Sequence, residues 1–459
     1  MKKKEEFIGT VVDVEFPNKA NVDVNGERVI VKNLIPGQVV RGCITKKRKG
    51  RYLGRLFEVM EKSPNEIDAP CKEFGSCGGC LYQSLPYEEQ LKLKEAQVKK
   101  MLEDVVGPLG DKYEGIVSSP KIFNYRNKME YSFGDAEKDG PLMLGMHKRG
   151  STYDITDASE CHIVHQDFNE VVDYTVKYFR ELGIKYYHKR THEGYLRYLL
   201  IRRGENTNEL MVNLVTSSQL DIDLTDWVNG LVKLKEDEII EQDLVSIVHT
   251  LNDTLADAIK PDSVNFLYGR EFFNESLLDL KFQVSPFSFF QTNSKGAEEL
   301  YKVVREFVGD TKDQIVFDLY SGTGTITQLV SPVAKKAVGV EIVEEAVAAA
   351  WDNSQLNGLS NCEFIAGDVL KVLDELTDKP DMIILDPPRD GIHPKALPKI
   401  IDYGVDELVY VSCKPSSLAR DLEVFLESGY EVNRVRFVDM FPHTPHCESI
   451  VLLKHVNQS

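Results

Sequence analysis

The sequence predicts an α/β protein built from three units, and three observations support this prediction. At 459 residues the chain is longer than one hydrophobic core accommodates, and common domain sizes give roughly three domains. Residues 7–60 alternate apolar and polar side chains, which indicates a small β-barrel. From about residue 286 onward, apolar strand-like runs alternate with helical patterns, as in parallel sheets covered by helices. We therefore place the units at 1–62, 63–285 and 286–459.

The first unit fits a five-stranded barrel of the OB type. Asn25-Gly26 separates two strand-like runs and is a strong hairpin signal. The basic run Lys46–Arg51 lies between two expected strands, and no acidic residue interrupts the basic residues from Lys46 to Arg55. This run is either a solvated hairpin tip or a loop that contacts phosphates, and we favour phosphate contact. The segment resembles the TRAM domain, an RNA-binding barrel found on RNA-modifying enzymes.

Charge is distributed unevenly along the chain. The net charge is −18, yet residues 1–60 carry 13 Lys and Arg against 7 Asp and Glu. The remaining residues carry 42 basic and 66 acidic side chains. A basic module on an acidic body is typical of an interaction module, although the body repels RNA except where local basic surface overcomes it. No apolar stretch approaches a membrane span, and no apolar core follows the charged start Met1–Glu6. We expect a cytoplasmic protein.

The second unit combines a helix, a cysteine cluster and a sheet. A helical pattern runs from Tyr87 to about Leu102. Strand-like runs at 128–133, 198–203 and 210–215 predict a mixed, largely antiparallel sheet. The second unit is therefore expected to be a mixed α+β domain.

Cys71, Cys77, Cys80 and the distant Cys161 suggest a metal site in this unit. Clustered cysteines in a reducing compartment indicate metal binding or catalysis more often than disulfides. Four thiolates suit tetrahedral zinc, and they also suit a cubane iron–sulfur cluster. The spacing differs from the C-x3-C-x2-C pattern of radical enzymes, so we expect a structural role or support for RNA binding.

A Gly-rich loop opens the third unit. Gly322 and Gly324 follow the apolar run that contains Asp318. A dinucleotide fingerprint needs a third glycine, and Thr327 stands at that position. Together with Glu341 at the end of the next apolar run, the loop instead resembles the S-adenosylmethionine (SAM) site of the class I methyltransferases, whose fold is Rossmann-like.

Further acidic residues follow strands in the same unit. The resemblance implies that Glu341 accepts hydrogen bonds from the ribose hydroxyls and that Asp368 contacts the adenine. Either acid could instead simply end a strand or cap a helix. Asp386 opens an Asp-Pro-Pro turn like that of amino-methyltransferases, which place a stacking aromatic next. Here Arg389 follows, which argues against methylation of nitrogen and leaves room for chemistry at carbon.

Cys413 ends another strand-like run. Ligands of doubly wound sheets bind beyond the carboxyl ends of the strands, so we expect this thiol beside the cofactor. Cysteine is well suited to adding covalently to an electron-poor carbon. The alternative is a small buried hydrophobe, which is a common use of free cysteine.

Four segments together resemble the RNA uracil-5-methyltransferase family. They are Phe289–Asn293, Asp386–Gly391, Ser412–Pro415 and His446–Ser449. The barrel and the cysteines match the 23S rRNA branch of this family, so the resemblance covers essentially the whole chain. It implies a C-terminal class I SAM-methyltransferase domain, an N-terminal TRAM barrel, and a 4Fe-4S cluster held by the four cysteines.

The resemblance also implies a covalent mechanism. C5 of uracil is too weak a nucleophile to take a methyl group directly. A thiolate that adds at C6 creates an enolate that attacks through C5, and a base must then remove the C5 proton. By resemblance Cys413 is the nucleophile and Glu448 the base. His443 and His446 are less favoured bases, and Glu448 could instead be an exposed acid at the start of the last strand.

The remaining site residues come from the same resemblance. The expected SAM contacts are Gln291, Tyr320, Gly322, Gly324, Thr325, Glu341, Asp368 and Asp386. Some family members have Asn where this chain has Thr325. The target uridine must leave its stack, and Phe287, Phe289 or Phe290 could stack on it, although such residues are more often core.

We expect the partner to be a flipped-out uridine of 23S rRNA, bound by a monomer. The nearest alternative is the same chemistry on tRNA, against which the barrel and cluster argue. A non-catalytic RNA-binding or ribosome-assembly factor is a third possibility, and the presence of both Cys413 and Glu448 argues against it.

Overall fold

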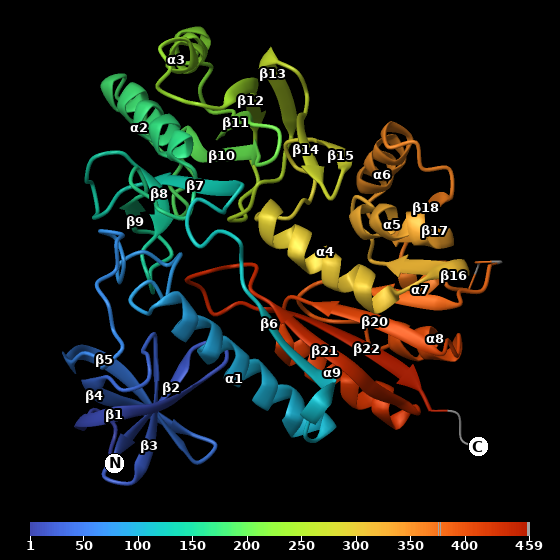
Figure 1. Ribbon diagram of the computed structural model, residues 1–459. Helices are drawn as coiled ribbons and strands as arrows, with labels where there is room; N and C mark the ends of the chain where they lie inside the picture. Colours follow the sequence, from blue (N-terminus) through green and yellow to red (C-terminus); the bar gives the residue numbers. More distant parts are fainter. Residues whose placement is uncertain (375, 377, 457–459) are drawn as a thin grey trace.

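The computed structural model describes residues 1–374, 376 and 378–456. Figure 1 shows a small barrel at the N-terminus, a central sheet with two helices, and a large C-terminal sheet between layers of helices. Within the described part of the chain, no helix is both long and apolar enough to cross a membrane.

The N-terminal unit is a closed barrel with the strand order β1-β2-β3-β5-β4, which confirms the predicted five-stranded barrel. Its strands are β1 (Glu6–Glu15), β2 (Lys19–Val24), β3 (Glu27–Lys32), β4 (Val39–Arg48) and β5 (Arg51–Glu61). Alternate side chains such as Val11, Val22 and Val29 fill its core. Lys49 and Gly50 turn the chain with positive φ angles between β4 and β5, so Lys46–Arg51 forms an exposed hairpin tip.

The link from the barrel contributes to the C-terminal sheet. α1 (Tyr87–Val106) packs against the barrel and against α9 (Pro415–Glu427). A short 3-10 turn, Gly110–Lys112, then leads into β6 (Tyr113–Val117). β6 pairs in parallel with β21 (Tyr430–Val438), at one edge of the C-terminal sheet (Figure 1). Residues close to the N-terminal barrel therefore complete the C-terminal sheet.

The central sheet has the order β13-β12-β11-β10-β7-β8-β9. Its strands are β7 (Lys128–Gly134), β8 (Met143–His147), β9 (Ile155–Asp157), β10 (Leu196–Gly204), β11 (Glu209–Thr216), β12 (Asp243–Leu251) and β13 (Ser263–Gly269). β11 and β12 are parallel and the other neighbours are antiparallel, as the sequence predicts. Two helices pack against this sheet, α2 (Gln166–Glu181) and α3 (Thr225–Glu236). The hairpin of β14 (Phe273–Leu277) and β15 (Leu280–Val284) follows.

The C-terminal sheet has the order β18-β17-β16-β19-β20-β22-β21-β6. Its other strands are β16 (Thr311–Leu319), β17 (Ala334–Glu341), β18 (Cys362–Ala366), β19 (Met382–Leu385), β20 (Glu407–Ser412) and β22 (Glu448–His455). Its helical segments besides α1 and α9 are α4 (Ser294–Val308), α5 (Thr325–Val330), the 3-10 turn Ser331–Val333, α6 (Glu344–Leu356), α7 (Val369–Val372) and α8 (Ala396–Asp402). β16 to β20 are parallel, so their carboxyl ends open at one edge, and β22 runs antiparallel beside β20. The predicted parallel α/β sheet is therefore confirmed.

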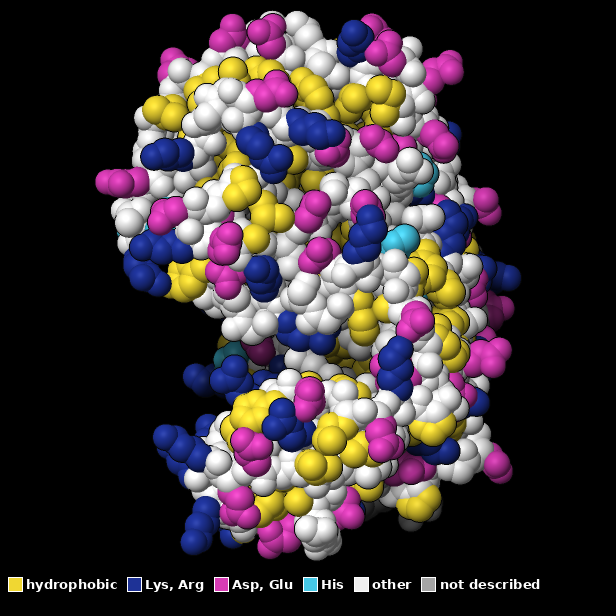
Figure 2. All heavy atoms as spheres, turned by 90° about the vertical axis from the view of Figure 1, so that its left-hand side faces the viewer, with side chains coloured by type: hydrophobic (Ala, Val, Ile, Leu, Met, Phe, Trp, Pro, Cys, Tyr) yellow, Lys and Arg dark blue, Asp and Glu magenta, His cyan; other side chains and the backbone are white. Residues whose placement is uncertain are grey.

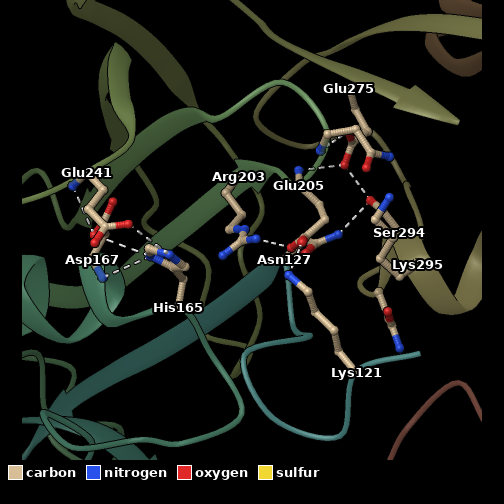
Figure 3. A network of polar contacts seen from close by, with 12 residues as sticks. Lys121, Asn127, His165, Asp167, Arg203, Glu205, Glu241, Glu275, Ser294 and Lys295 are labelled. Carbon is tan, nitrogen blue, oxygen red and sulfur yellow. Dashed lines mark hydrogen bonds and ion pairs between the residues drawn. The ribbon is translucent and has the colours of Figure 1, made fainter. Parts of the chain in front are cut away.

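A buried polar network joins the central sheet to the start of α4 (Figure 3). The Glu275 carboxylate accepts hydrogen bonds from the backbone N–H groups of Glu205 and Asn206 at 2.8 and 3.0 Å, and from the Ser294 hydroxyl. Arg203 forms an ion pair with Glu205. Because buried charges are costly unless paired, this network holds the central and C-terminal units in one relative position. The unit boundaries at residues 62 and 285 stay predictions.

Candidate active site

The Gly-rich loop follows β16 and leads into α5. Gly324 has a φ of 69°, and a Cβ atom there would lie 2.3 Å from the Phe364 ring. Only glycine fits this position without displacing that ring. Thr325 is the first residue of α5 and is buried, while Tyr320 and Gly322 stay partly exposed at the crevice.

Glu341, at the end of β17, braces this loop. One carboxylate oxygen accepts the Gly322 N–H at 3.0 Å, and the other accepts the Val343 N–H at 3.0 Å. The side chain is only partly buried, so the free lone pairs of its oxygens can still accept hydroxyl groups. Asp368 lies after β18 and caps α7 by accepting the Leu370 N–H at 3.0 Å. Both acids thus stand at strand ends beside the same loop.

Three carboxylates lie at the carboxyl ends of neighbouring strands or next to them. Asp318 lies near the end of β16, Asp386 follows β19, and Glu448 begins β22. Burial, and then the charge of Asp318, raises the pKa of Asp386 to about 7. Burial, and then the charge of Asp386, raises the pKa of Glu448 to about 8. The alternative of an exposed acid is wrong for Glu448, because only 5% of its surface is accessible.

The register of the sheet brings Cys413 to Glu448. Ser412 of β20 pairs with Ser449 of the antiparallel β22, so the residues next to this pair, Cys413 and Glu448, lie opposite each other. Burial, then the charges of Glu448 and Asp386, raises the pKa of Cys413 to about 11, whereas Arg389 opposes the rise. The thiol is partly exposed, so Cys413 is not the fully buried hydrophobe of the alternative interpretation.

Gln291 approaches the same pocket from the segment before α4. Its side chain lies near the Tyr301 hydroxyl and lowers the pKa of that hydroxyl, against the larger raising effects of burial and then of the Asp386 charge. Asp318 and Glu448 also raise the pKa of Tyr301, which places all these groups within electrostatic reach of one another. The predicted Gln291, Asp386 and Glu448 therefore converge.

This arrangement suits covalent chemistry with proton transfer. A thiol stands beside a carboxyl group whose pKa is near neutral, which is the range in which a general base works best. A braced Gly-rich loop opens at the same edge of the sheet and offers acceptors for a nucleoside.

A family model described as tRNA (Uracil-5-)-methyltransferase matches residues 86–456. The chain belongs to this family. The methyltransferase thus uses SAM to methylate C5 of uracil in RNA, and the resemblance found in the sequence is confirmed at that level.

Relatives with similar sequences span the full chain. An uncharacterized RNA methyltransferase of Clostridium tetani is 47% identical over 99% of this chain and 98% of its own. Another, of Caldanaerobacter subterraneus, is 45% identical over 99% of this chain and 100% of its own. The crystal structure of Pyrococcus abyssi tRNA (uracil-54, C5)-methyltransferase in complex with S-adenosyl-L-homocysteine superposes with a TM-score of 0.76 and 27% identity. It covers 97% of this chain and 100% of that one.

The four cysteines of the methyltransferase influence one another electrostatically. Burial raises the pKa of Cys80 to about 12, and the charges of Cys161, Cys77 and Cys71 add to this rise. Burial also raises the pKa of Cys161 to about 11, with contributions from Cys71 and Cys77. The Gly79 N–H donates to the Cys77 sulfur at 3.3 Å. Across the described residues, however, no three or more His, Cys, Asp or Glu side chains form a ready metal-binding group.

The three phenylalanines before Gln291 have different surroundings. Phe290 is buried, and the centroid of its ring lies 5.6 Å from that of Phe282, so it belongs to the core. Phe289 is 67% exposed and lies over the Gly-rich loop, 4.0 Å from the Cβ position of Gly322. The side chain of Phe287 is partly exposed.

Both histidines are poor proton acceptors in their surroundings. Burial lowers the pKa of His443 and of His446 to about 4 in each case. The Nδ1 atom of His443 lies 3.1 Å from Gln90 of α1, in the link to the barrel.

Sequence reasoning did not assign a role to three groups near the pocket. In the sequence, Arg389 stands where amino-methyltransferases have a stacking aromatic residue. In the structure, its charge lowers the pKa of both Cys413 and Glu448. Its position directly after the Asp-Pro-Pro turn was the available signal. Buried Arg202 of β10 donates to the carbonyl groups of Ser285, Pro286 and Ser288, in the segment that leads to Gln291. No sequence pattern marks Arg202 or Tyr301, because their partners are distant in the chain.

Proposed function

We propose that Cys413 is the nucleophile and Glu448 the general base of C5 methylation. The observation that carries this proposal is the ladder register that sets Cys413 beside Glu448, next to Asp386. The Cys413 thiolate forms a bond to C6, the electron pair of the C5–C6 double bond passes to C5, and C5 takes the methyl group of SAM, which leaves as S-adenosylhomocysteine. Glu448 then takes the C5 proton, and the returning electron pair expels the Cys413 thiolate.

Charge around the pocket supports these roles. Because burial and two carboxylates disfavour the Cys413 thiolate, a cation must offset them, and Arg389 is placed to do so. A Glu448 pKa of about 8 keeps the carboxyl group able to gain and lose a proton near neutral pH. Both groups lie in surroundings where burial is the first cause of their raised pKa values.

Substrate contacts follow from the same edge of the sheet. We propose that SAM is held by Gln291, Tyr320, Gly322, Gly324, Thr325, Glu341, Asp368 and Asp386. The partly free oxygens of Glu341 suit the ribose hydroxyls. Phe289 is the exposed ring beside the loop and is our candidate for stacking on the flipped uracil.

We propose that the RNA is 23S rRNA, modified in the cytoplasm by a monomer. The four mutually influencing cysteines support this choice, because the resemblance assigns a cysteine-held cluster to the rRNA branch. A tRNA is the second candidate, because the tRNA-modifying enzyme of Pyrococcus abyssi superposes on 97% of this chain. Since that share includes most of the barrel, the barrel by itself does not separate the two substrates.

Mapping 5-methyluridine in both RNA classes tests the substrate. We expect a strain that lacks this protein to lose 5-methyluridine from 23S rRNA while its tRNA keeps it. Loss from tRNA alone would overturn the rRNA proposal while leaving the C5 chemistry intact.

We propose that Cys71, Cys77, Cys80 and Cys161 hold a 4Fe-4S cluster. Their chemistry fits this group, because all four are free thiols that lie close enough to shift one another's pKa values. In addition, the Gly79 N–H donates to the Cys77 sulfur. Such a cluster would cross-link the 71–80 segment to the loop before α2, and none of the proposed steps at Cys413 passes through it.

Metal analysis of anaerobically purified protein checks this proposal. We expect brown protein with about four iron atoms per chain. Colourless protein with about one zinc per chain would contradict it. Cys161→Ser should lose the iron and still bind SAM, measured by calorimetry, because the SAM loop is built on a different sheet.

A further inference from the structure

The loop 439–447 connects β21 to β22 and ends directly before Glu448. Val438, the last residue of β21, is the ladder partner of Glu448. Asp439 therefore follows the residue opposite the base, and Cys447 precedes the base itself. Any shift of this loop at its stem moves the backbone from which the Glu448 carboxyl group projects.

A fully buried ion pair holds the start of this loop to α1. The Lys94 ammonium lies 2.7 Å from the Asp439 carboxylate, and neither side chain has accessible surface. The same ammonium donates to the Phe441 carbonyl at 2.9 Å, and the Tyr87 hydroxyl donates to Asp439 at 2.9 Å. A buried ion pair adds little net stability over an apolar pair, so its use here points to a requirement for geometry.

A second contact of α1 holds the middle of the loop. The backbone N–H of His443 donates to the side-chain oxygen of Gln90 at 2.8 Å. The side-chain nitrogen of Gln90 lies 3.1 Å from the ring atom Nδ1 of His443. His443 has a φ of 66°, which is uncommon for a residue with a side chain. Such a conformation persists only where its surroundings impose it, and Gln90 supplies part of that constraint.

The opposite side of the loop contacts the segments around the pocket. The side-chain amide of Asn293, two residues after Gln291, donates to the Met440 carbonyl at 2.9 Å. The Tyr125 hydroxyl donates to the Pro442 carbonyl at 3.0 Å. The loop is thus held between α1 and the segment that leads from Gln291 into α4, and most of its residues are buried.

We propose that Lys94 and Gln90 are positioning residues that act on the reaction through the 439–447 loop, by fixing where the Glu448 carboxylate stands. This inference rests on the proposed role of Glu448 as the base. Cys413 and the Gly-rich loop directly follow β20 and β16, which α1 does not hold through these contacts. Weakening the contacts should therefore slow the step that uses Glu448 and spare SAM binding and adduct formation.

Two variants test this separation. Gln90→Leu removes both contacts to His443 while keeping an apolar side chain of similar size. Lys94→Met leaves Asp439 buried and unpaired and is expected to fold poorly, so the double variant Lys94→Met/Asp439→Asn is used to remove both charges together. Lys100→Met is the matched control, because Lys100 lies on the same helix and is exposed.

The readouts are SAM affinity by calorimetry, the rate of covalent adduct formation, and the rate of adduct decay on uracil-containing RNA. We expect adduct decay to slow about 10- to 100-fold in both variants, as for a misplacement of about 1 Å, with SAM affinity and adduct formation unchanged. Lys100→Met should match the parent protein in all three.

The inference is overturned if folded variants release product at the parental rate. It is equally overturned if all three readouts fall together, because α1 would then support only the general fold. Glu448→Gln is measured in parallel. If that variant alone traps the adduct, the base assignment stands and the positioning role fails, whereas free turnover of Glu448→Gln would reject the base assignment itself.

Discussion

Charged side chains are largely buried at the edge of the C-terminal sheet, where Asp386 and Glu448 lie, but exposed at the tip of the N-terminal barrel. Asp386 and Glu448 are enclosed at the edge of the C-terminal sheet, and burial raises the pKa of each by several units, to about 7 and about 8. The basic side chains of Lys46–Arg51 stand in solvent at the end of a hairpin. Enclosed charges acquire chemistry through desolvation, whereas exposed charges act over distance and are weakened by salt.

The two regions also differ in how they meet RNA. Figure 2 shows the surface hollowed between the barrel and the central unit, with Lys and Arg side chains projecting beside the hollow. An exposed cationic tip can attract phosphates of any sequence, but it cannot select a base. We propose that selection of uracil and its chemistry belong to the edge of the C-terminal sheet. In this proposal the barrel contributes affinity for RNA and the sheet edge carries the reaction.

The largest effect is expected from Cys413→Ala, which removes the thiol that the ladder register sets opposite Glu448. Methylation should fall by at least about 10⁴-fold, as for other lost nucleophiles. The check is a denaturant-stable protein–RNA complex on RNA that contains 5-fluorouracil, formed only with SAM, because fluorine at C5 cannot be removed as a proton. Retained methylation by Cys413→Ala would reject the covalent mechanism.

Glu448→Gln should separate the two halves of the reaction. Addition and methyl transfer proceed, but elimination should slow by about 10²- to 10⁴-fold, since the amide cannot accept the proton. Ordinary RNA should then accumulate as the covalent complex, visible on a denaturing gel. Normal turnover would place the base elsewhere, with His446 as the next residue to replace.

The raised pKa of Glu448 predicts the pH dependence of adduct decay. Below a pKa of about 8 the carboxyl group is protonated and cannot act as the base, so decay should rise about tenfold per pH unit and level off above pH 8. Single-turnover decay of the isolated adduct between about pH 6 and about pH 9.5 measures this. Glu448→Gln provides the control and should be flat. A flat profile for the parent protein would contradict the raised pKa.

The smallest effect is expected at the barrel. Reversing Lys46 and Arg48 to Glu should weaken RNA binding and lower the slope of log affinity against log salt by about 1.4, as for two lost contacts to single-stranded RNA. The turnover of saturated enzyme should not change. Lys312→Glu/Lys335→Glu carries the same charge change on the exposed surface of the C-terminal unit and serves as the control. An unchanged slope at the barrel would leave the run as a solvated tip.

Strand ends explain why much of the site could be read from sequence. Gly322, Glu341, Asp386 and Cys413 each follow an apolar run, and parallel strands bring such positions to one edge. The order of apolar runs and polar ends was therefore enough to predict a shared pocket. Glu448 shows the limit of this reasoning, because an acid at the start of a strand is either exposed or enclosed, depending on what packs over it.

Contacts between distant segments could not be predicted. The helical pattern predicts that Lys94 lies on the exposed polar face of the helix, yet its side chain is fully buried against Asp439. β6 lies inside the predicted second unit in sequence but completes the C-terminal sheet. Nothing local marks either feature, because each depends on a partner more than three hundred residues away along the chain.

The sequence by itself determined the barrel, the parallel sheet and the residue types that gather at its edge, because hydrophobic periodicity and turn residues act over short stretches of chain. Only the tertiary structure decided that Cys413 stands beside Glu448, that Asp318, Asp386 and Glu448 lie near one another where burial raises their pKa values, and that α1 holds the loop before Glu448. These features arise from strand register and from desolvation, and both depend on which distant segments pack together.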